Sequence, residues 1–265
     1  MKLHSGTLGL RKLALISLCL ILIMAVFALP SRGVGAQDEE PEFTRDFRLE
    51  DCRFKTTGEN PYFILKPGYQ LVFEGEEEGE TLRLEIKVLH ETETINVPDI
   101  GEVETRVVEE VETIDGEPLE TSRNFFAICS PTNDVYYFGE DVDIFNEDGT
   151  VSHEGAWRAG EPDEDGVAEP GLIMPGTFLL GSRYFQEIAE GIAMDQAEHT
   201  EMGLEVTVPA GTFTDCVQVL ETTPLEPGAE TEKIYCPGIG LVIDDVFELV
   251  EYGFVKNGGD DHDDQ

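Results

Sequence analysis

The residue types and spacing that point most directly to chemistry lie in an acidic turn. The segment Asp141-x-Asp143-x-x-Asn146-x-Asp148-Gly149 gathers carboxylate and amide oxygens before a glycine, and calcium prefers such hard oxygen ligands. The spacing differs from that of an EF-hand, because Ile144 would take a ligand position. A hairpin turn rich in Asn, Asp and Gly needs no ion. The four oxygen-bearing residues are therefore a candidate calcium site, and an ordinary turn is the favoured interpretation.

Carboxylate chemistry is a second option, because the chain contains 56 Asp and Glu residues. Glycoside hydrolysis needs two carboxyl groups at a set separation in space. The sequence gives no means of choosing two acids out of so many. A secreted hydrolase that uses a carboxylate pair is therefore an alternative hypothesis to which we assign no catalytic residue.

Other catalytic patterns are missing from the sequence. The histidines His90, His153, His199 and His262 do not stand in a metal-binding spacing such as HExxH. No G-x-S-x-G motif marks a nucleophilic serine, and Ser130 has no identifiable base. These observations favour a non-enzymatic domain that needs no cofactor.

A ligand cavity is suggested by aromatic residues that flank a long irregular segment. Residues 155–176 are rich in Gly, Pro and acidic side chains, and a loop of this length is usually functional or mobile. Tyr136, Trp157 and Tyr184 are our candidates for lining a cavity beneath it. The competing interpretation is a place in the core, which is more usual for aromatic residues on strands.

Residues 1–36 have the features of an export signal. Lys2, Arg11 and Lys12 precede an apolar run over residues 13–29, and Val34-Gly35-Ala36 supplies small residues for cleavage. An uncleaved membrane anchor is the alternative, since the run approaches the ~18 residues that span a bilayer. We expect cleavage, which leaves no membrane span and a secreted or periplasmic protein.

Four cysteines follow the export signal, and an even number in an exported chain predicts two disulfides. If Thr223 faces Ala229 across a loop, counting back along both strands places Cys216 opposite Cys236, close enough to bridge. A tight turn centred on Pro227-Gly228 would instead slide the pairing and separate these cysteines. With the first register, Cys52 and Cys129 form the second disulfide by elimination.

The charge of the chain excludes some partners. The 56 acidic residues outnumber 17 Lys and Arg, for a formal net charge of −39. Binding to nucleic acid requires clustered basic residues, and an anionic membrane surface would repel this chain. The carboxylates are spread along the sequence, which favours solubility at the cost of self-repulsion.

The hydrophobic pattern predicts short strands joined by turns. Residues 81–89 alternate apolar and charged side chains, as a half-buried strand does. Asp115-Gly116 and Pro209-Ala210-Gly211 predict hairpin turns. Further strands are expected over residues 69–74, 103–114, 119–128, 135–139, 142–145, 150–153, 182–188, 206–242 (three strands) and 240–252, with one short helix over 189–200.

Several motifs occur together along this pattern. They are Asn60-Pro61-Tyr62-Phe63 with Pro67-Gly68, Val135-Tyr136-Tyr137-Phe138-Gly139-Glu140, Val208-Pro209-Ala210-Gly211-Thr212-Phe213, Thr223-Pro224-Leu225-Glu226-Pro227-Gly228 and residues 235–242. Together they resemble a family of exported, β-rich bacterial proteins of unknown function. The resemblance implies export and a β-rich fold, and it supplies no catalytic residue. Members usually lack a cysteine in the segment that matches residues 235–238, so Cys236 is a departure.

We therefore predict an all-β protein, with an antiparallel meander that forms a partly open barrel or two packed sheets and carries one short helix. Residues 1–36 are a signal peptide, 37–58 an acidic arm, 59–255 a single β domain and 256–265 a disordered acidic tail. The leading functional hypothesis is non-enzymatic binding of a small molecule or an envelope component. A calcium-responsive structural protein is the remaining alternative.

Overall fold

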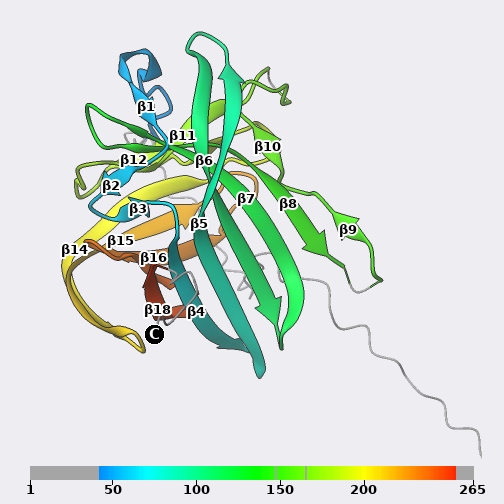
Figure 1. The fold of residues 1–265 in the computed structure, drawn as a ribbon, viewed down its shortest axis with the longest axis vertical. Coiled ribbons are helices and arrows are strands. Elements are labelled where there is room, and N and C mark those ends of the chain that lie inside the picture. The colour runs from blue at the N-terminus through cyan, green and yellow to red at the C-terminus, as the bar shows by residue number, and fades with distance from the viewer. Residues whose placement is uncertain (1–41, 147, 165, 255–265) are drawn as a thin grey trace, which may run out of the picture. The chain divides into compact units, whose positions relative to one another are not determined.

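The protein is shown in Figure 1 as a computed structural model that describes residues 42–146, 148–164 and 166–254. The predicted signal peptide and the predicted acidic tail lie outside the described residues. Within them, strands joined by turns make up the fold, and the helical content is one 3-10 turn, η1 (Leu49–Asp51). The predicted all-β, antiparallel fold is confirmed.

The strands of the described residues vary from two to eighteen residues in length. In chain order they are β1 (Phe54–Lys55), β2 (Gly58–Asn60), β3 (Phe63–Leu65), β4 (Tyr69–Glu77), β5 (Glu80–Val97), β6 (Gly101–Ile114), β7 (Glu117–Cys129), β8 (Val135–Phe145), β9 (Val151–Ser152), β10 (Trp157–Arg158), β11 (Glu169–Met174), β12 (Arg183–Phe185), β13 (Glu187–Ile188), β14 (Gln196–Val208), β15 (Gly211–Thr222), β16 (Glu230–Cys236), β17 (Gly240–Asp244) and β18 (Phe247–Phe254).

Most of these strands belong to one antiparallel sheet. Its order is β12-β14-β15-β16-β17-β18-β4-β5-β6-β7-β8-β11-β13, with β1, β9 and β10 added at its sides, while β2 and β3 form a separate pair. The strands β14 and β15 run at a steep angle to β5–β8 in Figure 1. The path begins at β12 and ends at β13, which are separated in the chain by Gln186 alone. No backbone ladder in the described part joins these two end strands, so the sheet is a barrel that is not closed.

Long hairpins build the first half of the sheet, from β4 to β8. The turn between β6 and β7 is Asp115-Gly116, as predicted, and both residues have positive φ angles of 50° and 85°. Such angles match the strand twist in a two-residue hairpin, and glycine adopts them without strain. Alternating apolar and polar residues keep one face buried along the first part of β5, whereas both faces of β6 are buried over residues 105–108.

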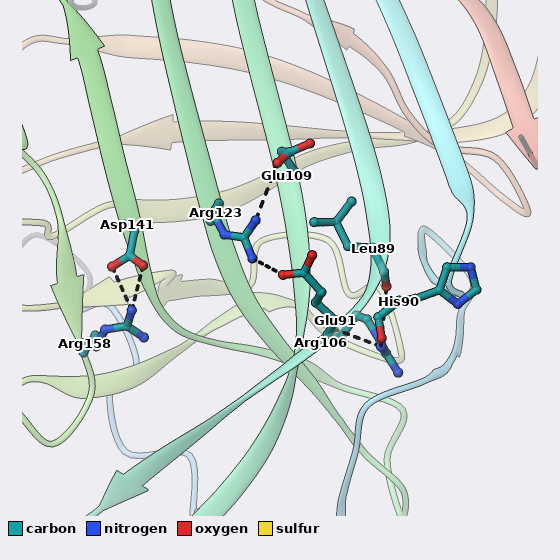
Figure 2. Close-up of polar contacts among 8 residues, drawn as sticks. All are labelled: Leu89, His90, Glu91, Arg106, Glu109, Arg123, Asp141 and Arg158. Carbon is teal, nitrogen blue, oxygen red and sulfur yellow. Dashed lines mark hydrogen bonds and ion pairs between the residues drawn. The ribbon is translucent and has the colours of Figure 1, made fainter. Parts of the chain in front are cut away.

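A bulge interrupts the pairing of β5 with β6 between Val88 and Thr92. The buried guanidinium of Arg106 on β6 satisfies the carbonyls that the bulge leaves free (Figure 2). Its Nη1 donates to the carbonyl oxygens of His90 at 2.8 Å and Glu91 at 3.0 Å. Its Nε donates to the carbonyl of Thr56 at 2.9 Å. Arg106 therefore ties the bulge to the N-terminal segment.

The second half of the sheet contains the predicted disulfide hairpin. Thr222 pairs with Glu230 and Val217 pairs with Tyr235, which places Cys216 opposite Cys236. Their sulfur atoms are bonded, and the Cα atoms are 4.2 Å apart. The register in which Thr223 faces Ala229 is confirmed, and with it the first predicted disulfide.

The N-terminal segment, predicted as an arm, packs onto the sheet from Glu42 onward in the described residues. Cys52 forms the second predicted disulfide with Cys129, with Cα atoms 5.1 Å apart. Strand β1 pairs with β7 just beyond it. The ring of Phe54 lies edge-on to Tyr136 and Phe138. This segment therefore covers the outward face of β7 and β8 instead of hanging loose.

Two predicted elements are wrong. The helix expected over residues 189–200 does not form: residues 189–193 turn, with Gly191 at φ 74°, and β14 begins at Gln196. Ladders to β12 and β15 on both sides of β14 override its helix propensity. The single strand expected over residues 240–252 is a hairpin of β17 and β18, with Asp245 at φ 51° in its turn.

Candidate functional site

The four calcium candidates do not converge on a shared position. Asp141 accepts hydrogen bonds from Nη2 of Arg158 at 2.8 Å and 2.7 Å on its two carboxylate oxygens (Figure 2). Asp143 has its Oδ1 3.0 Å from Nδ1 of His153. Among the described residues, no group of three or more His, Cys, Asp and Glu side chains is placed to hold a metal ion.

The remaining two candidates stabilise the turn itself. Asp148 accepts a hydrogen bond from the backbone N–H of Thr150 at 2.9 Å, and the Thr150 hydroxyl also donates to it. Asn146 donates from Nδ2 to the Thr150 hydroxyl oxygen at 3.2 Å. These hydrogen bonds lie within one exposed turn and stabilise it, which is the ordinary role of Asn and Asp in turns.

The three cavity candidates are buried and meet different neighbours. Tyr136 contacts Phe54 of the N-terminal segment, and the adjacent Tyr137 points to the opposite face of β8. Trp157 donates from Nε1 to the carboxyl of Glu187 at 3.4 Å. The hydroxyl of Tyr184 lies 2.9 Å from Nε2 of His199. The three rings are part of the buried core, as the competing interpretation expected.

Sequence reasoning missed the feature that distinguishes the inward face of this sheet. Carboxyl groups from strands on both halves of the sheet influence one another's ionisation across this face. We call this set the inner acidic cluster: Glu110 and Glu112 on β6, Glu120 on β7, Glu140 on β8, Glu187 on β13, Asp195 before β14, Glu221 on β15 and Asp244 on β17.

Strand geometry explains why glutamates of β6 point inward. Val108, Glu110 and Glu112 occupy alternate positions and so share one face. We call this face the inner one; both faces of β6 are buried here, since Val107 is 2% and Val108 is 1% exposed. Paired residues of neighbouring strands lie on the same face, and Glu110 pairs with Ser122 while Glu112 pairs with Glu120. The carboxyl groups of Glu110, Glu112 and Glu120 therefore lie on one face of β6 and β7.

The carboxyl groups of β6 are difficult to ionise. Burial, opposed by Lys233 and reinforced by the charges of Asp244 and Glu120, raises the pKa of Glu110 to about 7. Burial and the same acidic neighbours raise the pKa of Glu112 to about 7 as well. Burial also raises the pKa of Glu120. Near neutral pH Glu110 and Glu112 are therefore only partly charged.

A second group of carboxyls lies where the ends of the sheet meet. Burial raises the pKa of Glu140 to about 8, although a hydrogen bond with Tyr137 lowers it. Burial and the charge of Asp195 raise the pKa of Glu187 well above its usual range. Burial and the charge of Glu221 raise the pKa of Asp195 to about 6. Desolvation is the leading cause in each case.

Lys233 on β16 is the cation that opposes this negative charge. Its Nζ lies 3.0 Å from Oε2 of Glu221 and 3.5 Å from Oδ2 of Asp244. These two carboxylates raise the pKa of Lys233 well above its usual range in spite of its burial. One ammonium group cannot balance eight carboxyls, so the inner acidic cluster carries unneutralised negative charge once its protons leave.

The outward side of the same strands is neutralised differently. Figure 2 shows Arg123 between Glu91 and Glu109, and Arg158 against Asp141. Because adjacent residues of a strand face opposite sides, Glu109 meets an arginine while Glu110 does not. Arg123 on β7 and Arg158 on β10 thus neutralise carboxylates of the outer face, and they leave the carboxyls of the inner face unpaired with arginine.

The arrangement suits two kinds of chemistry. Unneutralised carboxylates attract positively charged groups. Carboxyls with raised pKa values can also act as proton donors near neutral pH. In the sequence, Glu110 and Glu112 stand at alternate positions of β6 after Val108. No local sequence signal shows that these glutamates lie near the carboxyl groups of β13, β15 and β17.

Comparisons of this chain with protein-family models, with curated proteins and with solved structures find no match. The resemblance to a family of exported bacterial proteins therefore stays a prediction that rests on the quoted motifs.

Proposed function

We propose that this domain is a non-enzymatic binding protein that takes a positively charged ligand on the inner acidic cluster. The observation that carries the proposal is the excess of inward carboxyls over Lys233, the cation that faces them. A ligand that brings positive charge would favour the ionised form of Glu110 and its neighbours. Binding would then supply the countercharge that the fold itself lacks.

The ligand class follows from the same electrostatics. A linear amine or a short basic peptide could contact carboxyls on several strands, whereas an anion would be repelled. Such binding should strengthen as the pH rises and the cluster ionises, and it should weaken with salt. An apolar ligand would show neither dependence. These two trends separate a charge-driven site from a hydrophobic one.

We place this activity outside the cytoplasm. The signal-like segment supports export, and the two disulfides are typical of an oxidising compartment. In the described part of the chain, no helix is long and apolar enough to cross a membrane. Solutes or components of a cell envelope are therefore the ligands to test first.

Calorimetric titration of the domain tests the proposal. A linear triamine, a linear diamine and a neutral diol of matched length would be compared at about pH 8, above the pKa values of Glu110, Glu112 and Asp195. The amines should bind, the triamine more tightly, and the diol should not. Glu110→Gln should weaken binding, while Glu102→Gln, an exposed position on the same strand, should leave it unchanged. Absence of amine binding, or equal losses in both variants, would reject the site.

Hydrolysis by a carboxylate pair is the second candidate. Glu140, with its pKa raised to about 8, has the protonation state of a general acid at neutral pH. Glu187 lies near it on the same face. Incubation with a panel of glycans tests this function, and activity lost in Glu140→Gln but kept in Glu102→Gln would establish it. Inactivity across the panel would leave binding as the remaining function.

A further inference from the structure

Strand β6 loses its neighbour β7 at Arg106. The ladder between the two strands ends with Arg106 opposite Phe126, whereas β6 itself extends back to Gly101. Past Phe126, strand β1 takes the place of β6 beside β7, with Lys55 opposite Ile128. Because β8 pairs along the other edge of β7, β1 and β6 occupy the same edge of that strand. The two strands therefore form a fork whose apex is Arg106.

The arms of the fork are joined at the apex and leave a groove beyond it. Arg106 donates from Nε to the carbonyl of Thr56 at 2.9 Å and from Nη2 to its hydroxyl oxygen at 3.1 Å. A groove of about 390 Å³ lies between residues 49–56 and residues 99–104. Figure 1 shows β1 beside the end of the β5–β6 hairpin that lines it. Ligand sites in proteins commonly have volumes of about 300 to 1,000 Å³, so the fork has room for part of another chain.

Both strands present backbone groups without a ladder to this groove. Half of the N–H and C=O groups of an edge strand point away from its partner. In the described part of the chain, residues 101–105 of β6 pair with β5 alone, and β1 pairs with β7 alone. Because β1 and β6 are both antiparallel to β7, they run parallel to each other. A strand inserted antiparallel to β6 would therefore be antiparallel to β1 as well.

We propose that this fork is a docking site for an extended segment of another protein, which adds a strand between β6 and β1. The side chains of that segment alternate between basic residues and small apolar ones. The site is separate from the inner acidic cluster, and the inference holds whether or not that cluster binds a ligand. It follows from the side chains that line the groove.

The two kinds of side chain follow from the alternation along β6. Val103 is buried at 4% exposure, whereas Glu102 and Glu104 occupy the adjacent positions and are exposed. Leu49 and Ile100, which also line the groove, pack against the core. A strand docked beside β6 would have alternate side chains beside Val103 and beside the two carboxylates. Apolar and basic residues in turn are the pattern that fits both.

The ionisable groups of the groove favour a basic partner. They are Glu50, Asp99, Glu102 and Glu104 with Lys55, four carboxyls against one ammonium group. A second copy of this chain, with a formal net charge of −39, would be repelled. Charged residues on an edge strand prevent identical edges from pairing. The occupant is therefore a basic segment of another protein and not a second copy.

A synthetic peptide tests the docking site. It alternates lysine and valine over about seven residues, a usual strand length, and two further versions carry N-methyl groups on the lysine amides or on the valine amides alone. Calorimetric titration should show that the plain peptide binds and that a version with glutamate in place of lysine does not. At least one N-methylated version should fail, because strand addition uses backbone N–H groups. Amide exchange of residues 101–105 should slow when the peptide binds.

Glu104→Lys should weaken binding of the peptide about tenfold, because an attraction becomes a repulsion. Glu117→Lys is the matched control, exposed at the far end of the β6–β7 hairpin. Glu110→Gln, which tests the inner acidic cluster, should leave peptide binding unchanged, so the two sites are tested separately. Equal binding of both N-methylated versions, equal losses in both lysine variants, or unchanged exchange of residues 101–105 would overturn the site. Dimerisation that protects this edge without peptide would do so too, because the occupant would then be a second copy.

Discussion

Replacing Glu110 by glutamine tests whether the inner acidic cluster destabilises the native state once it ionises. The substitution keeps the size of the side chain and removes its charge. In the native protein, burial and the neighbouring acids raise the pKa of Glu110 from 4.5 to about 7, against the opposing effect of Lys233. A raised carboxyl pKa means that the native state holds this proton more tightly than the unfolded chain does. Stability is therefore lost as the pH rises from about 4.5 to about 7.

The magnitude follows from that difference in pKa. Linkage converts it to about 3 kcal/mol of stability lost above neutral pH, at ~1.4 kcal/mol for each tenfold change in proton affinity. Water still reaches this half-buried side chain, and solvent screening reduces the value to about 2 kcal/mol. Glu110→Gln should recover that energy at alkaline pH and change little at acidic pH, where the native carboxyl is already neutral. For a domain of this size the melting temperature should rise by about 4 to 8 °C.

Thermal unfolding followed by circular dichroism between about pH 5 and about pH 9 measures the effect. The matched control is Glu102→Gln, which removes the same charge from an exposed position on β6. Equal gains in both variants would mean that net charge, and not the buried environment, sets the effect. A gain for Glu110→Gln that persists at acidic pH would also refute the reasoning, because no charge is then present to remove.

Three further substitutions probe the scaffold. Replacing Cys216 and Cys236 together by serine should lower the free energy of unfolding by about 3 kcal/mol, because the disulfide no longer links two positions 20 residues apart in the unfolded chain. Urea unfolding of the variant, of the parent protein and of the reduced parent protein measures this loss. Arg106→Ala should cost about 3 kcal/mol by leaving buried carbonyls of the bulge unsatisfied. A loss no larger than that of Arg83→Ala, at a half-buried position on β5, would contradict its role. Gly171→Ala places a Cβ 2.1 Å from the carbonyl oxygen of Gln186, so it should destabilise the pairing of β11 with β13 by about 1 to 3 kcal/mol, seen as faster amide exchange in β11 and β13.

Local patterns in the sequence were sufficient for most of the strands. Alternation over residues 81–89 identified β5, and Asp115-Gly116 identified the turn that follows β6. The loop after Thr223 favoured the register that brings Cys216 opposite Cys236, over a tight turn at Pro227-Gly228 that would have separated them, and the structure has the favoured register. These successes share a cause, because a turn and the strands beside it are contiguous in the chain and specify one another.

Elements whose partners are distant in sequence were not predictable in this way. Residues 196–200 have the composition of a helix, but they become a strand because β12 and β15 offer ladders on both sides. The long segment 155–176 contains β10 and β11, whose short ladders to β8 have no periodic signal of their own. Asp141 was grouped with the turn that follows it, whereas its partner is Arg158, 17 residues away.

The candidate functional site likewise depends on partners that are distant in sequence. The sequence by itself determined that the chain is acidic and that β6 carries Glu110 and Glu112 at alternate positions. Only the tertiary structure decided that those positions face Glu221, Lys233 and Asp244 from the other half of the sheet. The physical reason is that alternation specifies the two faces of a strand but not what each face meets. Burial and neighbouring charge, which set the pKa of every carboxyl in the cluster, arise only when distant strands come together.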